Sequence, residues 1–332
     1  MSYLCPLVQH GAARPKGAMP LAGGPLWFTH LERLSRDAAP EVIGVSETDS
    51  ATLDRLTRAR APVLGLDLAQ PRVMGIVNAT PDSFSDGGLN AAPQDAVSAA
   101  RAMMRDGADL LDIGGESTRP GAATVPGPAE IARVVPVLEG LRGEGFPISV
   151  DTRKAAVAQA AVSAGAGLVN DVSALTFDAG MTAFCADNSL PVCIMHAQGD
   201  PATMQADPRY DNVLLDVYDF LSARLDALEA QGIARERVLI DPGIGFGKTL
   251  EHNLALLRGL SLFHALGSAI LLGVSRKRFI GTLSDEPEPA RRFPGSVAAG
   301  LAALAQGVQI LRVHDVRETV QAIRLWQAVR ES

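Results

Sequence analysis

The sequence predicts a (β/α)8 barrel, that is, a TIM barrel, preceded by a short irregular N-terminal extension. From Val73 onward, short apolar runs alternate with alanine-rich stretches of helical period. Such strand-then-helix alternation implies a parallel sheet with crossover helices, and eight repeats over about 260 residues match the size of a closed barrel. A second observation is that polar residues recur where the strands end. An open, doubly wound sheet is the main alternative, and periodicity alone does not exclude it.

The apolar runs predict eight strands, at residues 73–78, 109–114, 147–151, 167–171, 191–195, 237–241, 269–273 and 309–313. The helical periods predict eight helices, at about 94–106, 128–142, 154–164, 179–187, 212–231, 251–265, 295–306 and 316–330. Before these elements, six prolines interrupt the short apolar pieces of residues 1–70. We therefore expect residues 1–70 to form an N-terminal extension and residues 71–332 to form the barrel.

The composition bounds the class of protein. Of the 332 residues, 47% are hydrophobic and 20% are charged, which suits one large globular domain or a domain with an appendage. The 30 basic and 37 acidic residues give a net charge of −7, which argues against a nucleic-acid surface. Cys5, Cys185 and Cys193 are odd in number and lack metal-ligand spacing, which argues against a disulfide framework or a zinc site. Without an apolar run of signal-peptide or membrane-spanning type, a cytoplasmic protein with no membrane partner is expected.

The strand ends carry groups that can do chemistry. Six of the eight runs end in, or are closely followed by, such a group: Asn78, Asp151, Asp171 after Asn170, His196, Asp241 and Ser275. The second run carries Asp112 and leads to Glu116, and the eighth carries Arg312 and leads to His314. A single aspartate at a strand end is usually a helix cap, but eight strand ends of this kind together are not explained by capping. In a barrel all of them open on the rim where active sites are built.

Two polar loops follow the first two strands. In MGIVNATPDSFSDGG, residues 74–88, Asn78 can bind a metal or an anion, and Phe84 is an apolar ring among turn formers. Either this is a surface turn, or it is a lid that closes over a substrate. In LDIGGESTRPG, residues 111–121, Arg119 either clamps a carboxylate or is solvated, and the glycines let the backbone approach a ligand.

Three later segments bear cationic groups. DPGIGFGKT, residues 241–249, lacks the glycine spacing of a Walker loop or a dinucleotide fingerprint, so Lys248 is as readily a surface lysine as a ligand-binding one. In GVSRKRF, residues 273–279, Lys277 can reach inward while its basic neighbours stay in water. In RVHD, residues 312–315, Arg312 and His314 alternate onto one face and suit a phosphate or pyrophosphate, although His314 could also be a satisfied core histidine.

Taken in order, these segments resemble a known family. MGIVNATPDSFSDGG, LDIGGESTRPGA, SVDTRK, LVND, IMHAQG, DPGIGFGK, GVSRKRFIG and RVHDV are similar in order and spacing to the signature segments of the dihydropteroate synthases. The likeness covers about residues 72–330, and residues 1–70 lie outside it. It implies a transferase of folate biosynthesis that joins a pterin pyrophosphate to p-aminobenzoate, and a homodimer is the family habit.

The resemblance also implies roles for particular residues. Asp151, Asn170, Asp241 and Lys277 would bind the pterin ring, and Asn78, Arg312 and His314 would hold the diphosphate, with Mg2+ on Asn78. The p-aminobenzoate site would be formed by Phe84, Thr118, Arg119, Pro120 and Ser275, and the substrate-binding residues would include Val313 and Phe246. Arg119, Lys277, Arg312 and His314 would be the catalytic residues. In the family mechanism the bond to pyrophosphate breaks first, and the aniline nitrogen then attacks the pterin cation.

Two other functions remain open at this point. A cobalamin-linked methyltransferase shares the fold and the pterin pocket, but it does not need the Asp-Ser-Phe loop and the arginine-containing second loop that this sequence has. A non-catalytic or attenuated synthase paralogue is the other alternative. It would be expected to lack the lysine, the loop arginine or the anion-binding pair, and Lys277, Arg119, Arg312 and His314 are all present.

Overall fold

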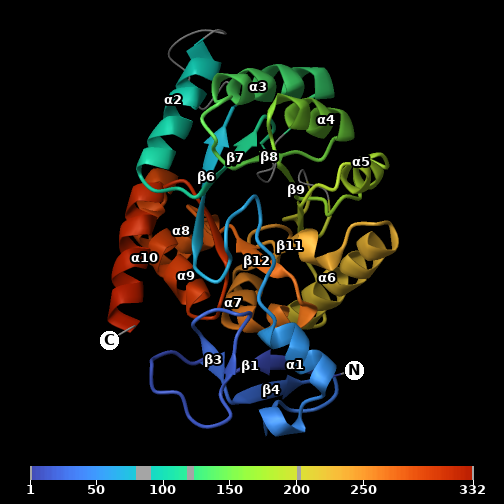
Figure 1. The fold of residues 1–332 in the computed structure, drawn as a ribbon, viewed down its shortest axis with the longest axis vertical. Helices are drawn as coiled ribbons and strands as arrows, with labels where there is room; N and C mark the ends of the chain where they lie inside the picture. Colours follow the sequence, from blue (N-terminus) through green and yellow to red (C-terminus); the bar gives the residue numbers. More distant parts are fainter. Residues whose placement is uncertain (1, 80–90, 118–122, 200–202, 331–332) are drawn as a thin grey trace.

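The computed structural model describes residues 2–79, 91–117, 123–199 and 203–330, which form a closed barrel above a small N-terminal unit (Figure 1). The eight parallel barrel strands are β6 (Arg72–Asn78), β7 (Leu110–Gly114), β8 (Ile148–Asp151), β9 (Leu168–Asp171), β10 (Val192–Met195), β11 (Val238–Asp241), β12 (Ala269–Leu272) and β13 (Ile310–Val313). β13 pairs in parallel with β6, with Ile310 opposite Arg72, and this pairing closes the ring. The barrel prediction is confirmed and the open sheet is excluded.

Helices follow the strands and cover the outside of the barrel. They are α2 (Ala91–Arg105), α3 (Gly127–Gly140), α4 (Ala155–Ala164), α5 (Met181–Asp187), α6 (Val213–Ala230), α7 (Leu250–Arg258), α8 (Arg278–Ser284), α9 (Phe293–Leu304) and α10 (Val316–Arg330). Short 3-10 turns lie at Val45–Glu47, Arg235–Arg237, Leu260–Leu266 and Pro289–Arg292. In the part of the chain described here, no helix is both long and apolar enough to cross a membrane.

Two helical segments differ from the prediction. The predicted helix at 251–265 ends at Arg258 and continues as the 3-10 helix η4 (Leu260–Leu266). Gly259 separates them, and a Cβ added there would lie 2.6 Å from a methyl group of Leu214 in α6, so the glycine allows Leu214 to pack closely at this crossing. The short helix α8 was not predicted at all, because seven residues do not contain enough turns to show a helical period.

The barrel interior is apolar in its lower half. An inner core of buried side chains fills it: Val63, Leu68, Met74, Leu110, Leu168, Cys193, Leu239, Ala269, Leu271 and Ile310. The intervening strand residues, such as Val73, Leu111 and Val169, pack outward against the helices in a separate and larger core. This alternation follows from the two-residue period of a strand. The inner core closes the barrel interior at the amino ends of the strands, so a pocket inside the barrel can open only at the carboxyl ends.

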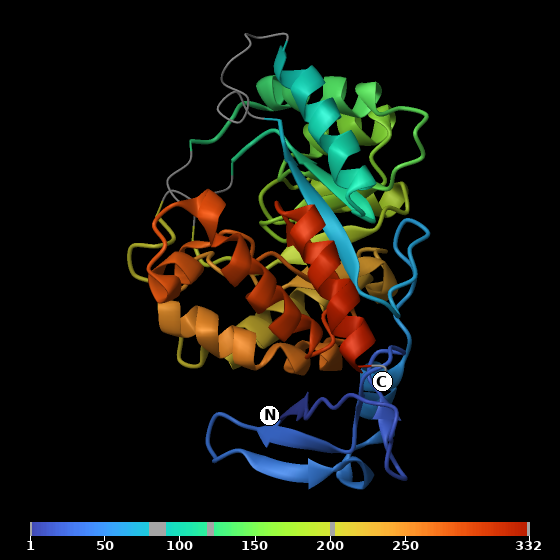
Figure 2. The same cartoon turned by 90° about the vertical axis from the view of Figure 1, so that its left-hand side faces the viewer.

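The N-terminal region is more ordered than its prolines predict. β1 (Tyr3–Pro6), β4 (His30–Leu34) and β5 (Glu41–Gly44) form an antiparallel sheet, β2 (Met19–Pro20) pairs with β3 (Trp27–Phe28), and α1 (Ser50–Thr57) follows. Pro6 and Pro20 each end a strand, where a missing N–H costs little. Leu21, Leu31 and Leu56 are buried in a small core of this region. Figure 2 shows these strands below the barrel, beside the end of α10.

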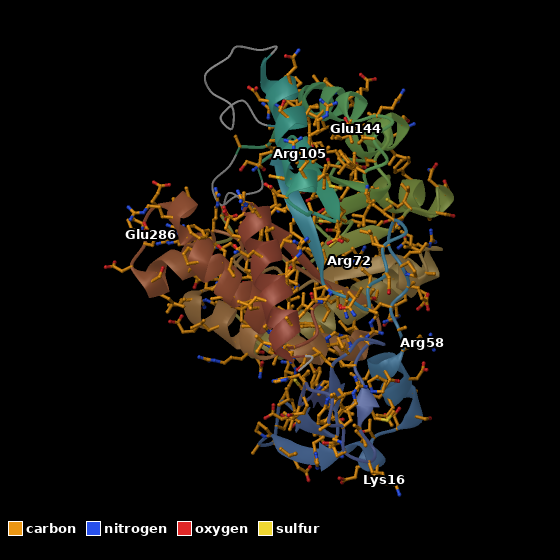
Figure 3. The ribbon with its side chains drawn as sticks, turned by 60° about the vertical axis from the view of Figure 1, so that its left-hand side comes forward. Lys16, Arg58, Arg72, Arg105, Glu144 and Glu286 are labelled. Atoms are coloured by element: carbon orange, nitrogen blue, oxygen red, sulfur yellow. The ribbon has the colours of Figure 1, made fainter. Side chains whose placement is uncertain are left out.

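Several contacts fix the N-terminal region to the barrel. The Tyr3 hydroxyl donates to Asp219 over 2.8 Å, and the Cys5 thiol lies 3.2 Å from the Ser261 hydroxyl. Arg58, which lies at the junction in Figure 3, forms an ion pair with a carboxylate of the barrel. Since β1 also packs on η4 and α6 through buried apolar side chains, the region forms one packed unit with the base of the barrel.

Candidate active site

Polar residues occupy the upper half of the barrel because of where they stand in each strand. Asp112, Asn170, Asp241 and Arg312 each lie two residues beyond a member of the inner core and therefore point into the barrel. Asp151 is the last residue of β8 and follows the buried Ser149 by the same spacing. These five strand residues therefore converge on one mouth, whereas Asp171, which the sequence also singled out, accepts the N–H groups of Ser173 and Leu175 and caps the turn after β9.

Four of these residues form a hydrogen-bonded group on one side of the mouth. Arg312 donates from Nε to Asp112 over 2.6 Å and from Nη2 to Asp151 over 2.8 Å. Asn170 donates from Nδ2 to the same oxygen of Asp112 over 2.9 Å. Asp112 therefore holds Arg312 and Asn170 in place. Asp112 is not among the site residues predicted from the sequence, although its two-residue spacing from the inner-facing Leu110 indicates that it points into the barrel.

Each carboxylate of this group has one oxygen that can accept a further hydrogen bond. Asp112 Oδ1 and Asp151 Oδ1 are buried and accept no hydrogen bond from the described residues. Burial raises the pKa of Asp151 to about 7; the charge of Arg312 opposes this shift and that of Asp112 adds to it. Burial disfavours the charge of Arg312, but Asp112 and Asp151 outweigh it and raise the pKa of Arg312 above its ordinary value. This side of the site thus consists of a buried guanidinium and two carboxylates that can each accept a further hydrogen bond.

A second group lies across the mouth. Asp241 Oδ1 accepts the N–H of Gly243 over 2.7 Å, and burial raises the pKa of Asp241. Lys277 donates to the carbonyl of Ile244, and its Nζ lies 4.7 Å from the ring centroid of Phe246. Burial lowers the pKa of Lys277 to about 8, against the attraction of Asp241. A carboxylate and a readily deprotonated lysine therefore face the same space.

Gly273 lies between Asp241 of the second group and Arg312 of the first. A Cβ at this position would lie 3.9 Å from Asp241 Oδ2 and 4.0 Å from Arg312 Cβ. Glycine therefore leaves the space between these side chains open. The charge of Arg312 also opposes the rise in the pKa of Asp241, which indicates that these two side chains lie within electrostatic reach of one another.

The remaining predicted residues lie around the rim. The Ser275 hydroxyl accepts the backbone N–H of His314 over 3.1 Å and lies 3.0 Å from its Nδ1. Asn78 ends β6 and is half-buried. The Val313 side chain is buried in the core between barrel and helices, so only its backbone is available to the pocket. Phe84, Thr118, Arg119 and Pro120 lie outside the described residues.

A buried lysine supports the loop after β11. Lys248 is only 3% exposed, so it is not a surface lysine. Its Nζ lies 2.9 Å from Nδ1 of His196 and donates to the carbonyl of Phe246 over 3.0 Å. Burial lowers the pKa of Lys248 well below its ordinary value and that of His196 to about 3. Sequence could not reveal this pairing, because the two residues lie 52 positions apart.

The segment SVDTRK continues from Asp151 into a network of buried charges. Lys154 Nζ lies 2.6 Å from Glu116 and 2.5 Å from Glu130, and Thr152 donates to Glu130 over 2.6 Å. Arg153 adds a contact of 3.2 Å to Glu116. This network fixes the backbone that follows Asp151, and it joins the end of β8 to the loop after β7.

The barrel and its polar mouth match a known class. The model of the family described as pterin binding enzyme matches residues 74–314, so the chain belongs to the class of pterin-binding enzymes. A dihydropteroate synthase of Escherichia coli strain K12 is 47% identical over 265 residues, which are 79% of this chain and 93% of the relative. The chain belongs to the dihydropteroate synthase family.

Solved structures agree with this assignment. A Xanthomonas albilineans dihydropteroate synthase with 4-aminobenzoic acid is 49% identical, with a TM-score of 0.78, and the match covers 82% of this chain and 98% of that one. The same enzyme in complex with 7,8-dihydropteroate is 47% identical, with a TM-score of 0.74, over 80% of this chain and 96% of that one. Residues 1–73 precede the family match.

Proposed function

We propose that the chain condenses 6-hydroxymethyl-7,8-dihydropterin pyrophosphate with p-aminobenzoate, giving 7,8-dihydropteroate and pyrophosphate. Family membership supports the reaction, and one observation supports this site as the place where the pterin binds. Asp112 and Asp151 each present a buried oxygen without a partner among the described residues. A buried acceptor left unpaired costs about 1–3 kcal/mol, so this position favours a ligand rich in N–H donors. The aminopyrimidine edge of a pterin is such a ligand.

The two groups at the mouth suit opposite sides of the pterin. Asp151 would accept hydrogen bonds from the aminopyrimidine edge, and the amide of Asn170 on the neighbouring strand would complete the contact with this edge. Asp241 offers a further acceptor. Lys277 would donate from the other wall, where it already contacts Phe246. Arg312 is held by Asp112 and Asp151 at the boundary between these groups, so it can reach the ring and the diphosphate from one position.

The diphosphate would lie on the rim, against Asn78, Arg312 and His314. The described residues contain no group of three or more His, Cys, Asp or Glu side chains that could hold a metal ion. Among the described residues of this rim, Asn78 would offer Mg2+ its amide oxygen, and Mg2+ typically takes most of its other ligands from phosphate and water. When bound, Mg2+ would supply positive charge to the leaving diphosphate.

The p-aminobenzoate site is proposed at the same rim. Ser275 is its described member and is held by His314, and the residue types of Phe84, Thr118, Arg119 and Pro120 suit a flat ring with a carboxylate. Val313 would contribute only its backbone. The bond between the pterin methylene carbon and the diphosphate oxygen would break first, its electron pair leaving with the diphosphate. The aniline nitrogen would then attack the cation and lose a proton, so no protein nucleophile is required.

We also propose a cytoplasmic homodimer. Leu325 and Val329 lie one turn apart on α10 and are 67% and 69% exposed, which supports contact with a second copy.

A coupled assay for pyrophosphate release tests the function. Release should require the pterin pyrophosphate, p-aminobenzoate and Mg2+ together. Replacing Arg119 by Ala should leave pterin affinity nearly intact and raise the p-aminobenzoate concentration needed for half-maximal rate, whereas Lys16→Ala, on the exposed surface, should change neither. A folded protein that binds the pterin but releases no pyrophosphate would be an attenuated paralogue. Methyl transfer from methyltetrahydrofolate would instead support the methyltransferase alternative.

A further inference from the structure

A second cavity lies at the opposite end of the barrel from the active site. Its volume is about 220 Å³, and its walls come from the N-terminal region, from α10 and from the segments that lead into β6 and β13. Pro71 and Gln309, which immediately precede those two strands, both line it. Because the proposed catalytic groups stand at the carboxyl ends of the strands, this cavity is separate from them. In Figure 1 the C-terminal end of α10 lies just above the N-terminal strands.

The walls are mostly apolar. Leu21 and Leu26 come from the N-terminal region, Leu304 and Val308 from the barrel, and Trp326 from α10. A cavity of about 150 Å³ lined by apolar side chains holds benzene, so this volume suits a single substituted ring. Trp326 offers a flat surface for such a ring.

The charged side chains of the lining are all basic. Arg14 comes from the N-terminal region and Arg330 from α10, His10 also lines the cavity, and no aspartate or glutamate is part of the described lining. The guanidinium of Arg330 lies 4.1 Å from the ring centroid of Trp326, and Arg14 donates to the carbonyl of Pro25 over 2.8 Å. Within the described ranges, no carboxylate forms an ion pair with either arginine. Arg14 and Arg330 supply positive charge to a cavity whose other walls are mostly apolar, which favours an anionic ligand.

We infer that this cavity is a binding site for a monocyclic aromatic carboxylate, with the ring against Trp326 and the carboxylate between Arg330 and Arg14. The inference does not depend on the proposed function. Burial lowers the pKa of Arg330, and a carboxylate bound beside it would oppose this shift. The site exists only because the N-terminal region covers the base of the barrel. Gln327 donates to Gln70 over 2.9 Å and ties the two sides together at the rim.

The test uses benzoate as the probe and benzamide as its neutral counterpart. The chain has two tryptophans, so the indole N–H region of a ¹⁵N NMR spectrum contains two signals, which Trp27→Phe assigns. Benzoate should shift the Trp326 signal saturably in the full-length protein, and benzamide should bind at least about 10-fold more weakly, because it lacks the charge that strengthens the contact with arginine. Reading the signal at Trp326 separates this site from the proposed p-aminobenzoate site.

Matched arginine variants complete the test. Arg330→Gln and Arg14→Gln should each weaken benzoate binding about 10-fold, whereas Arg324→Gln, exposed on the same helix, should not. The inference is overturned if benzoate leaves the Trp326 signal unmoved at millimolar concentration, or if benzamide binds equally well. It is also overturned if the Trp326 signal responds to protein concentration but not to benzoate, because a second copy would then cover the cavity.

Discussion

Replacing Lys154 by Met should destabilise the protein strongly, although Lys154 is not itself a proposed site residue. Its ammonium lies 2.6 Å from Glu116 and 2.5 Å from Glu130. The lysine side chain is 13% exposed, and the two carboxylates are 4% and 0% exposed. Methionine has a similar length but no charge, so the variant would leave two carboxylates buried without their shared cation.

The magnitude follows from burial. Removing one partner of a buried ion pair costs about 3–5 kcal/mol, because the remaining charge is left uncompensated. Unfolding entropy is about 2.1 cal/mol/K per residue, or roughly 0.7 kcal/mol/K for 332 residues. The thermal midpoint should therefore fall by about 4–7 °C. Thr152 and Arg153 still contact the two carboxylates, which places the expectation toward the lower end of this range.

The loss should depend on pH in a defined direction. Burial alone would raise the pKa of Glu116, but the contacts with Lys154, the Val125 N–H and Arg153 outweigh it and lower this pKa. The stabilisation from Glu116 is thus present above its unfolded pKa of about 4.3 and is lost as the pH falls through the lower folded value. Without Lys154 one of these lowering contacts is lost, so the folded pKa of Glu116 is higher in the variant than in the wild type, and the variant gains less stability from Glu116 as the pH rises. The gap between wild type and variant should be widest near neutral pH and narrow toward pH 4.

Thermal unfolding followed by circular dichroism at one scan rate measures this gap. Lys16→Met is the matched control, because Lys16 is exposed in the N-terminal region (Figure 3) and should shift the midpoint by less than about 1 °C. A second variant, Lys154→Arg, keeps the charge and should recover part of the loss. The reasoning is refuted if Lys154→Met melts with the wild type at neutral pH, or if its deficit is as large at pH 4.5.

Three further outcomes are expected. Asp151→Asn should weaken pterin binding by about 1–3 kcal/mol in calorimetry, because an acceptor becomes partly a donor facing a donor; unchanged affinity would remove Asp151 from the pterin site. Pterin affinity should peak between about pH 7 and pH 8, since Asp151 accepts once it has lost its proton and Lys277 is a cation while it keeps its own. Lys277→Arg should abolish the alkaline fall, and a flat wild-type profile would contradict both assignments. A chain beginning at Gln70 should unfold more easily than one beginning at Ala61 by about 3–6 kcal/mol, since it lacks Val63 and Leu68 of the inner core; equal midpoints would instead support a domain boundary at residue 70.

Local pattern alone predicted the barrel. The predicted strand at 309–313 is β13, Ile310–Val313, and the predicted helix at 316–330 is α10. Both were predictable because apolar residues recur with a period of two in strands and of 3.6 in helices. The same period decided that Arg312 points inward and that Val313 does not. Short or densely packed elements were less visible. The helix α8 has too few turns to show a period, and the break at Gly259 depends on Leu214 of another helix.

The sequence by itself determined which strand ends carry polar groups, and hence that those pointing inward meet at one mouth, since parallel strands in a barrel end on the same side. Only the tertiary structure decided which of them touch. Arg312 and Asp112 are 200 residues apart and meet because β13 closes against β6, next to β7. Likewise, burial shifts the pKa values of Asp151 and Lys277, and burial depends on the whole ring of strands and the helices around it. A residue's face is a local property of its strand, whereas its partner and its dielectric surroundings are set by chain segments far away in sequence.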